Sequence, residues 1–244
     1  MVDVSLCSHI IMGFATVGRD YSVDLNPIGG YEALASFAEL RKRRPSLKLM
    51  ITVGGGAGDS NFKEMASTES NRQRFINSTA WALRRADLDG IDLDWEYPEV
   101  ADAANFVSLL QEASAELKRD PQRPLLSAAV PAPVTLVVGR YRIPAIAKSV
   151  DFVNLMTYDL HTYQWYTPFV DHNSPLFPRA GELPVLNKLN LATWILSNGY
   201  GGTMTFSLDS DDWQGKCGNG TFPLHKAIAH QGNDGNSQHL QFNR

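Results

Sequence analysis

Short apolar segments alternate with amphipathic segments along most of the chain. Residues 9–17 form an apolar run with several β-branched side chains, which predicts a strand, whereas residues 31–44 place apolar side chains at helical spacing. The same two patterns recur further along. Additional strands are expected at residues 47–53, 89–95, 124–130, 150–156 and 202–208, and additional helices at residues 71–86, 105–118, 186–198 and 223–230.

Strands that alternate with helices and are apolar at nearly every position are typical of a parallel sheet covered by helices. The pattern therefore predicts an α/β fold. A doubly wound sheet and a closed (β/α)8 barrel both fit it. The composition does not shift along the chain, so we expect one domain over residues 1–230 and a polar tail over residues 231–244.

Length and charge exclude several function classes. The 244 residues suffice for one sizeable core and match the roughly 250 residues of a (β/α)8 barrel. A balance of 22 basic against 26 acidic side chains offers no general basic surface, so we expect no nucleic-acid partner. The apolar runs are too short to cross a bilayer, and residues 1–4 lack the basic start of a secretory signal. We therefore expect neither a membrane span nor a signal peptide.

The cysteines and the possible N-glycosylation sites give little information about function. Cys7 and Cys217 are the only cysteines, and they do not form a metal-ligand pattern. Asn77 and Asn219 each begin an Asn-x-Thr sequon, which permits N-glycosylation, although such triplets often occur by chance.

Three carboxylates stand at every second position of the expected strand at residues 89–95 and just beyond it. Side chains alternate between the two faces of a strand, so Asp92, Asp94 and Glu96 would line one face at ~6.6 Å steps. Burial and mutual repulsion at that spacing raise the pKa of at least one carboxyl group, and a general acid must stay protonated near neutral pH. The opposite face would carry only apolar side chains, namely Ile91, Leu93 and Trp95.

Two other interpretations of these acids fit the sequence less well. A solvated strand face fits poorly, because flanking helices imply a strand that is covered on both sides. A metal site is disfavoured, because the segment contains no histidine and none elsewhere has ligand spacing to it. Acid catalysis is therefore the favoured hypothesis.

The segment Asp89–Pro98 resembles the Asp-x-x-Asp-x-Asp-x-Glu signature of family 18 glycoside hydrolases, the chitinases and chitinase-like lectins. This resemblance implies a TIM (β/α)8-type barrel. It extends over most of the chain, with matches to barrel strands or strand-end motifs at residues 6–11, 52–55, 127–130, 154–159 and 201–204.

In that family the substrate's own acetamido oxygen attacks the anomeric carbon, so the resemblance implies no cofactor and no metal. It assigns the general acid to Glu96, stabilisation of the acetamido N–H to Asp94, a shared proton to Asp92 and positioning of the acetamido oxygen to Tyr158. It also implies an extracellular monomer that acts on chitin or chito-oligosaccharides. The implied substrate-binding residues are Phe14, Gly55, Tyr97, Met156, Thr157, Asp159 and Phe206.

The chain departs from the family pattern at several places. Phe206 stands where the family has a sugar-stacking Trp, and Gly56 and Met12 replace further aromatic residues. Barrel strands one and seven and the α+β insertion have no counterpart, so about six of eight strands are expected. The family partners of both cysteines lie in those missing regions, which predicts unpaired thiols or an unplanned pair.

Four hypotheses for function follow. A chitinase is favoured because the acid signature and Met156–Asp159 are intact. A binding-only lectin is suggested by the lost aromatic residues, and an inactive truncated product by the missing strands. An endo-acting glycosidase on N-glycans shares the signature, but the strand motifs resemble animal chitinases more closely.

Overall fold

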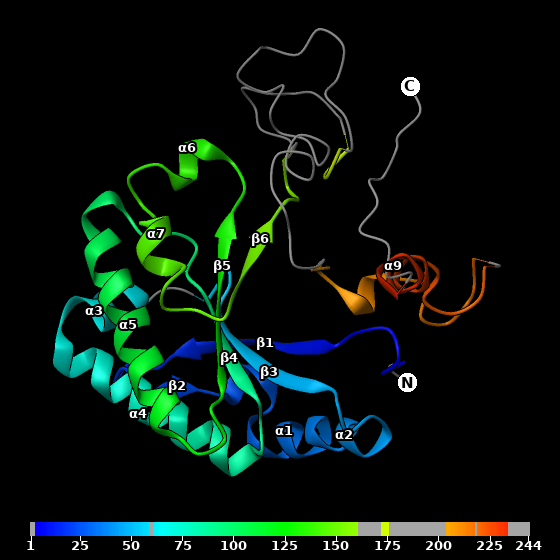
Figure 1. Ribbon diagram of the computed structural model, residues 1–244, viewed down its shortest axis with the longest axis horizontal. Coiled ribbons are helices and arrows are strands. Elements are labelled where there is room, and N and C mark those ends of the chain that lie inside the picture. The colour runs from blue at the N-terminus through cyan, green and yellow to red at the C-terminus, as the bar shows by residue number, and fades with distance from the viewer. Residues whose placement is uncertain (1–2, 59–60, 161–171, 176–203, 218, 234–244) are drawn as a thin grey trace, which may run out of the picture. The chain divides into compact units, whose positions relative to one another are not determined.

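In the computed structural model, the described part of the chain falls into two compact units (Figure 1). The larger unit lies within residues 9–199, and the smaller one joins residues 1–8 to residues 200–244. The described residues are 3–58, 61–160, 172–175, 204–217 and 219–233.

A six-stranded sheet forms the centre of the larger unit, in the order β2-β1-β3-β4-β5-β6. β2 pairs antiparallel with β1, and every other neighbouring pair is parallel. No described strand joins β6 back to β1, so the described sheet is an open part of a barrel. The strands are β1 (His9–Val17), β2 (Val23–Asp24), β3 (Lys48–Gly54), β4 (Gly90–Asp94), β5 (Leu125–Pro131) and β6 (Phe152–Met156).

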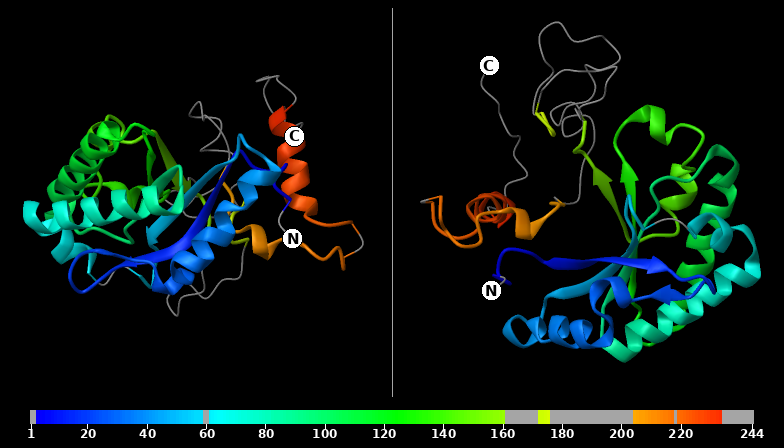
Figure 2. Two further views of the ribbon diagram at one scale, coloured as in Figure 1. Left: turned by 90° about the horizontal axis from the view of Figure 1, so that it is seen from below. Right: turned by 180° about the vertical axis from the view of Figure 1, so that it is seen from behind.

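Helices cover one face of this sheet, as the two views in Figure 2 show. The longest are α4 and α5, which pack against each other behind β4. None of the helices in the described residues is long and apolar enough to cross a bilayer. The helices of this unit are α1 (Gly30–Ala38), α2 (Leu40–Arg43), α3 (Phe62–Ser67), α4 (Glu69–Ala86), α5 (Ala103–Arg119), α6 (Val134–Val137) and α7 (Ile143–Ile146), with 3-10 turns η1 (Asn26–Ile28) and η2 (Val100–Asp102).

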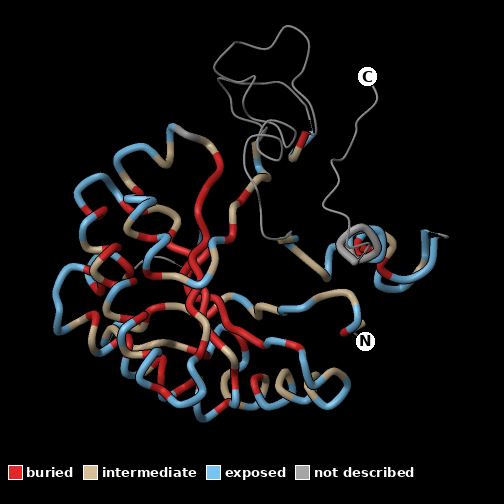
Figure 3. The backbone as a smooth tube through the Cα atoms, in the orientation of Figure 1, coloured by how far each residue is buried: buried red, intermediate tan, exposed pale blue. Residues whose placement is uncertain are grey.

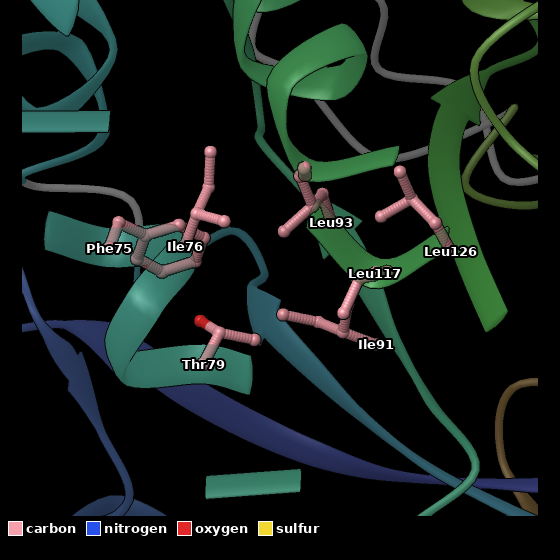
Figure 4. A pocket seen from close by; sticks show the side chains of 8 residues that line it. Phe75, Ile76, Thr79, Ile91, Leu93, Leu117 and Leu126 are labelled. Atoms are coloured by element: carbon pink, nitrogen blue, oxygen red, sulfur yellow. The ribbon is translucent and has the colours of Figure 1, made fainter. Parts of the chain in front are cut away.

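The core lies between the sheet and α4 and α5. Every residue of β4 is buried, and so is every residue of β3 and β5 after the first, because these central strands have neighbours on both sides and helices behind them (Figure 3). A cavity of about 10 Å³ remains there, at the lower limit for one water molecule. Its lining includes Ile91 and Leu93 of β4, Leu126 of β5, Thr79 of α4 and Leu117 of α5 (Figure 4). The apolar face predicted for β4 therefore points toward the helices.

Five of the six predicted strands are confirmed, with ends that differ by at most two residues. The strand predicted at residues 202–208 is wrong over Met204–Leu208, which form no strand, while residues 202–203 lie outside the described residues. No described strand pairs with this stretch. Its last residues turn instead, because the Ser207 carbonyl accepts the N–H of Ser210 over 3.1 Å. The sixth strand of the sheet is β2, which was not predicted.

Most predicted helices are also confirmed. The helix predicted at residues 31–44 divides at Glu39 into α1 and α2, because the hydrogen bonding there shifts to a three-residue step, with the N–H of Lys42 bonded to the Glu39 carbonyl. The helix predicted at residues 186–198 lies outside the described residues. The C-terminal helix, α9 (Pro223–Asn233), extends three residues beyond its predicted end, and residues 234–244 of the predicted tail are not described.

The smaller unit contains η3 (Leu208–Ser210) and α9. Asp211 caps α9, because its carboxylate accepts the backbone N–H of His225 over 3.0 Å and lies 2.8 Å from the ring Nδ1 of the same residue. Desolvation raises the pKa of Asp211, but the hydrogen bonds from His225 outweigh it and hold the pKa at about 2. Cys7 and Cys217 are both thiols, which is one of the two predicted alternatives.

Candidate active site

Most of the predicted site residues belong to the ends of four parallel strands in the larger unit. Glu96 and Tyr97 follow β4, and residues 156–159 end and follow β6. Gly55 follows β3, while Phe14 lies in β1. Because parallel strands end at the same edge of a sheet, these residues gather where barrel enzymes build their active sites.

Asp92 lies on the face of the sheet that is not covered by helices, and it is almost completely buried, at 4% exposure. Its Oδ1 accepts hydrogen bonds from the Ser127 hydroxyl at 2.6 Å and from the Asn154 amide at 2.9 Å. Its Oδ2 accepts one from the Thr52 hydroxyl at 2.9 Å. Desolvation raises the pKa of Asp92, and these three donors counteract that rise. The carboxylate is thus held by three neighbouring strands.

Asp94 differs from Asp92 in having an unused oxygen. Its Oδ1 is buried and has no hydrogen-bond partner among the described residues. Desolvation, followed by the negative charges of Glu96 and Asp92, raises the pKa of Asp94 to about 7. A buried polar atom without a partner is costly in a native protein, so this oxygen is poised to bond a ligand.

The Glu96 carboxyl group lies beside the backbone of Gly56. A β-carbon placed on Gly56 would stand 3.8 Å from one Glu96 oxygen and 3.9 Å from the other. This glycine occupies the position where the resembled family carries an aromatic residue. The absence of a side chain leaves the Glu96 carboxyl uncovered on this side.

Two tyrosines share the electrostatic field of these acids. Desolvation raises the pKa of Tyr158, and the charges of Asp94 and Glu96 raise it further. The pKa of Tyr97 is raised by desolvation and then by the charge of Glu96. Both phenols therefore stay protonated at physiological pH and can donate hydrogen bonds.

The turn after β6 is held by a short segment farther along the chain. The Ser174 hydroxyl donates a hydrogen bond to the Thr157 carbonyl over 2.6 Å. Asn173 accepts the backbone N–H of Asp159 over 3.1 Å through its side-chain oxygen. These bonds fix the backbone on both sides of Tyr158.

Phe14 and Gly55 form a close contact. The Phe14 ring packs so near Gly55 that an added β-carbon would lie 2.6 Å from a ring carbon. Among the described residues, three non-proline peptide bonds are cis, and each involves a predicted site residue: Gly13–Phe14, Glu96–Tyr97 and Phe206–Ser207. Phe206 itself belongs to the smaller unit and is 61% exposed, and its place relative to the other site residues stays a prediction.

Several supporting residues were not predicted. Thr52, Ser127 and Asn154 lie in strands adjoining β4 or one strand further, and the register places Thr52 and Ser127 directly opposite Asp92. Behind the strand, the Tyr141 hydroxyl donates a hydrogen bond to the Trp95 carbonyl over 3.1 Å. Small polar residues at matching depth in otherwise apolar strands were the signal that could have identified the first group.

Within the described residues, no group of three or more His, Cys, Asp or Glu side chains is placed to hold a metal ion.

Asp89, the first acid of the signature, lies at the far end of β4 from Glu96. There it accepts the backbone N–H of Leu49 over 2.9 Å and pairs with Lys48 at 3.0 Å.

Several known proteins are similar to this chain in sequence. Chitotriosidase-1 of Mus musculus is 39% identical over 194 residues, which are 74% of this chain and 41% of that protein. The chain spans less than half the length of the curated relatives it matches.

Solved structures show the same fold. A chitinase of Trichuris suis, described as immunomodulatory and active, has a TM-score of 0.71 and 36% identity, with 79% of this chain and 54% of that chain covered. Human YKL-39, described as a pseudo-chitinase with retained chitooligosaccharide binding, has a TM-score of 0.70 and 29% identity, with the same coverage. The described sheet is accordingly an incomplete TIM-type barrel. Because the profile of Glycosyl hydrolases family 18 matches residues 1–195, the chain belongs to that family.

Proposed function

We propose that the chain hydrolyses β-1,4-linked N-acetylglucosamine polymers, with Glu96 as the general acid. One observation carries this proposal: the buried Asp94 carboxyl has an oxygen without a described partner and a pKa raised to about 7. A carboxyl that is poised between its two protonation states beside Glu96 suits a site that must hold an acetamido N–H and balance developing positive charge.

In the proposed reaction, Glu96 gives its proton to the glycosidic oxygen while the bond from that oxygen to the anomeric carbon breaks. The acetamido oxygen of the same sugar forms a new bond to the anomeric carbon. Water then attacks the anomeric carbon while the bond from that carbon to the acetamido oxygen breaks, and the water loses a proton to Glu96, which restores the acetamido group and the enzyme and retains the configuration.

Asp94 and Tyr158 would orient the acetamido group. The free Oδ1 of Asp94 would accept the acetamido N–H, and the Tyr158 phenol would donate to the acetamido oxygen. Asp92 would share a proton with Asp94; both of its oxygens already accept hydrogen bonds, so it would not contact the sugar itself. These are the roles that the family resemblance implies.

The remaining site residues would contact the sugars around this centre. Met156, at 6% exposure, would close the floor of the acetamido pocket, and Tyr97 would adjoin the cleft. The partner we propose is chitin or chito-oligosaccharide. An extracellular monomer and the domain boundary at residue 230 belong to the same proposal.

A fluorogenic chitobioside tests the proposal. We expect the chain to release the reporter, and we expect Glu96→Gln to lose at least about 100-fold in rate, since a positioned general acid contributes 10²–10⁴-fold. The matched control is Glu32→Gln, which makes the same chemical change at an exposed position on α1. Equal rates for the chain and Glu96→Gln would contradict the assignment.

A chitin-binding protein without turnover is the second candidate. It is favoured by the similarity to YKL-39, which is described as a pseudo-chitinase that retains chitooligosaccharide binding. Saturable binding of chitotetraose by the chain, with no reporter release at high protein concentration, would support this candidate over the hydrolase. Absence of both binding and release would contradict both.

A further inference from the structure

A second hollow lies on the outer, helical side of the larger unit, and none of its lining residues belongs to the candidate active site. It has a volume of about 330 Å³ and is formed by β2, η1 and the beginning of α1 on one side and by α4 on the other. Small-molecule sites begin at about 300 Å³, so one ligand the size of a sugar residue would fit. We call this hollow the outer groove.

Two aromatic side chains line the outer groove, one from each side. Tyr31 and Trp81 meet edge to face, with ring centroids 5.7 Å apart. The Arg85 guanidinium lies over both rings, 4.3 Å from the Tyr31 centroid and 5.0 Å from that of Trp81. Trp81 nevertheless remains 50% exposed. The contacts therefore fix the indole in place while much of its surface stays open to solvent.

Polar side chains face these rings. Asp24 uses Oδ1 to accept the backbone N–H of Asn26 over 3.0 Å, which leaves Oδ2 available. Asn26 and Trp81, which carry an amide and an indole N–H, line the same groove. The groove thus offers both donors and acceptors around an aromatic surface.

The walls are joined directly, so the outer groove is already formed in the absence of a ligand. The Ser78 hydroxyl of α4 accepts the backbone N–H of Val23 in β2 over 3.0 Å and donates to the Phe75 carbonyl over 2.8 Å. A preformed site loses little entropy on binding.

From these features we infer that the outer groove is a second, non-catalytic carbohydrate-binding site for a neutral β-linked N-acetylhexosamine. The C–H bonds on one face of such a pyranose ring give it an apolar surface that can stack on Trp81, and its hydroxyl and acetamido groups match Asp24 and Asn26. Asp24 on the rim and Arg85 behind the rings carry opposite charges, which favours an uncharged ligand. The choice of N-acetylhexosamine rests on the proposed function.

The same sugar could come from solution or from the chain itself. Asn77 is exposed on α4, begins the sequon Asn77–Thr79 and lies four residues before Trp81. Residues four apart are neighbours on a helix surface. The first N-acetylglucosamine of a glycan on Asn77 would therefore lie beside the Trp81 ring.

Indole NMR tests the inference on the full chain, made in bacteria so that no N-glycan is present. The five tryptophans give separate indole N–H signals, and Trp81→Phe identifies that of Trp81. Titration with di-N-acetylchitobiose should move the Trp81 signal along a saturable curve with a Kd of about 1–10 mM. Trp213, which is 48% exposed in the smaller unit, is the matched control and should not move. No movement of the Trp81 signal, or equal movement of both, would overturn the inference.

Secretion from a eukaryotic host separates the two sources. Mass spectrometry first shows whether the secreted chain carries a glycan that Asn77→Gln removes. If it does, and the Trp81 signal of the glycosylated chain does not respond to chitobiose, the attached sugar occupies the groove. If the signal still responds, the occupant comes from solution. Reporter release by Trp81→Phe should equal that of the unchanged chain, so a failure of Glu96 catalysis and a failure of the outer groove give different results.

Discussion

Gly54 approaches Asp94 so closely that a β-carbon on the glycine would lie 2.0 Å from the Asp94 carbonyl oxygen. The next residue, Gly55, donates its backbone N–H to the same oxygen over 2.8 Å. The end of β3 therefore holds the end of β4 at the residue whose carboxyl group has the unused oxygen. The φ angle of Gly54, +118°, is also one that residues with side chains rarely adopt.

Gly54→Ala should lower the free energy of unfolding by at least about 3 kcal/mol, because backbone strain adds to a clash that only movement of β4 can relieve. Gly30→Ala is the matched control. Gly30 also has a positive φ, +64°, but nothing lies within 4 Å of its added β-carbon. It should lose only about 1–2 kcal/mol. Urea unfolding measures both, and equal losses would show that the contact with Asp94 is unimportant.

Ser127→Ala should destabilise the protein by about 1.5–3 kcal/mol, because it removes one of the three donors to the buried Asp92 carboxylate. Ser114→Ala provides the comparison. Ser114 is also buried, on α5, but its hydroxyl has no carboxylate partner among the described residues. A loss for Ser127→Ala no greater than that for Ser114→Ala would argue against a structural role for the Asp92 hydrogen bonds.

Asp94 should make stability depend on pH. Its pKa rises from 3.8 in the unfolded chain to about 7 in the folded one, so the folded state binds more protons between these values. The unfolding free energy should therefore fall as the pH rises from 4 to 7, by at most about 4 kcal/mol, and then level off. Asp94→Asn removes this dependence. The difference in unfolding free energy between the variant and the unchanged chain should therefore shift in favour of the variant as the pH rises from 5 to 8. A difference that is independent of pH would contradict the raised pKa.

Tyr141→Phe should reduce reporter turnover several-fold, because the lost hydrogen bond to the Trp95 carbonyl, worth about 1 kcal/mol, positions the backbone next to Glu96. The fall should be in kcat with little change in KM, since Tyr141 is buried and would not contact the sugar. Steady-state kinetics provide the measurement. An unchanged kcat would mean that Glu96 is positioned without this hydrogen bond.

Local patterns predicted much of this fold, and they failed where a neighbour decides the outcome. The alternation of Asp92 and Asp94 with Ile91 and Leu93 predicted both faces of β4, because side-chain direction follows from strand geometry alone. The apolar positions of residues 204–208 did not make a strand, because a strand also requires a partner.

The supporting contacts of the site were missed for a related reason, because the polar positions of the strands show that such residues exist but not which carboxylate they reach. Thr52, Ser127 and Asn154 are up to 102 residues apart in the sequence, and only the register of the sheet brings their side chains to Asp92. The pairing of Tyr141 with Trp95 likewise depends on how the turn after β5 folds back. The acid signature itself was recognisable because its four carboxylates lie within eight positions.

The most direct test of Glu96 as general acid is the turnover of two chitobiosides by the chain and by Glu96→Gln. One substrate has a poor leaving group that needs protonation, and the other has an activated group that does not. We predict that Glu96→Gln loses at least about 100-fold more rate on the poor leaving group than on the activated one. Equal losses on the two substrates, or no loss on either, would contradict the central claim.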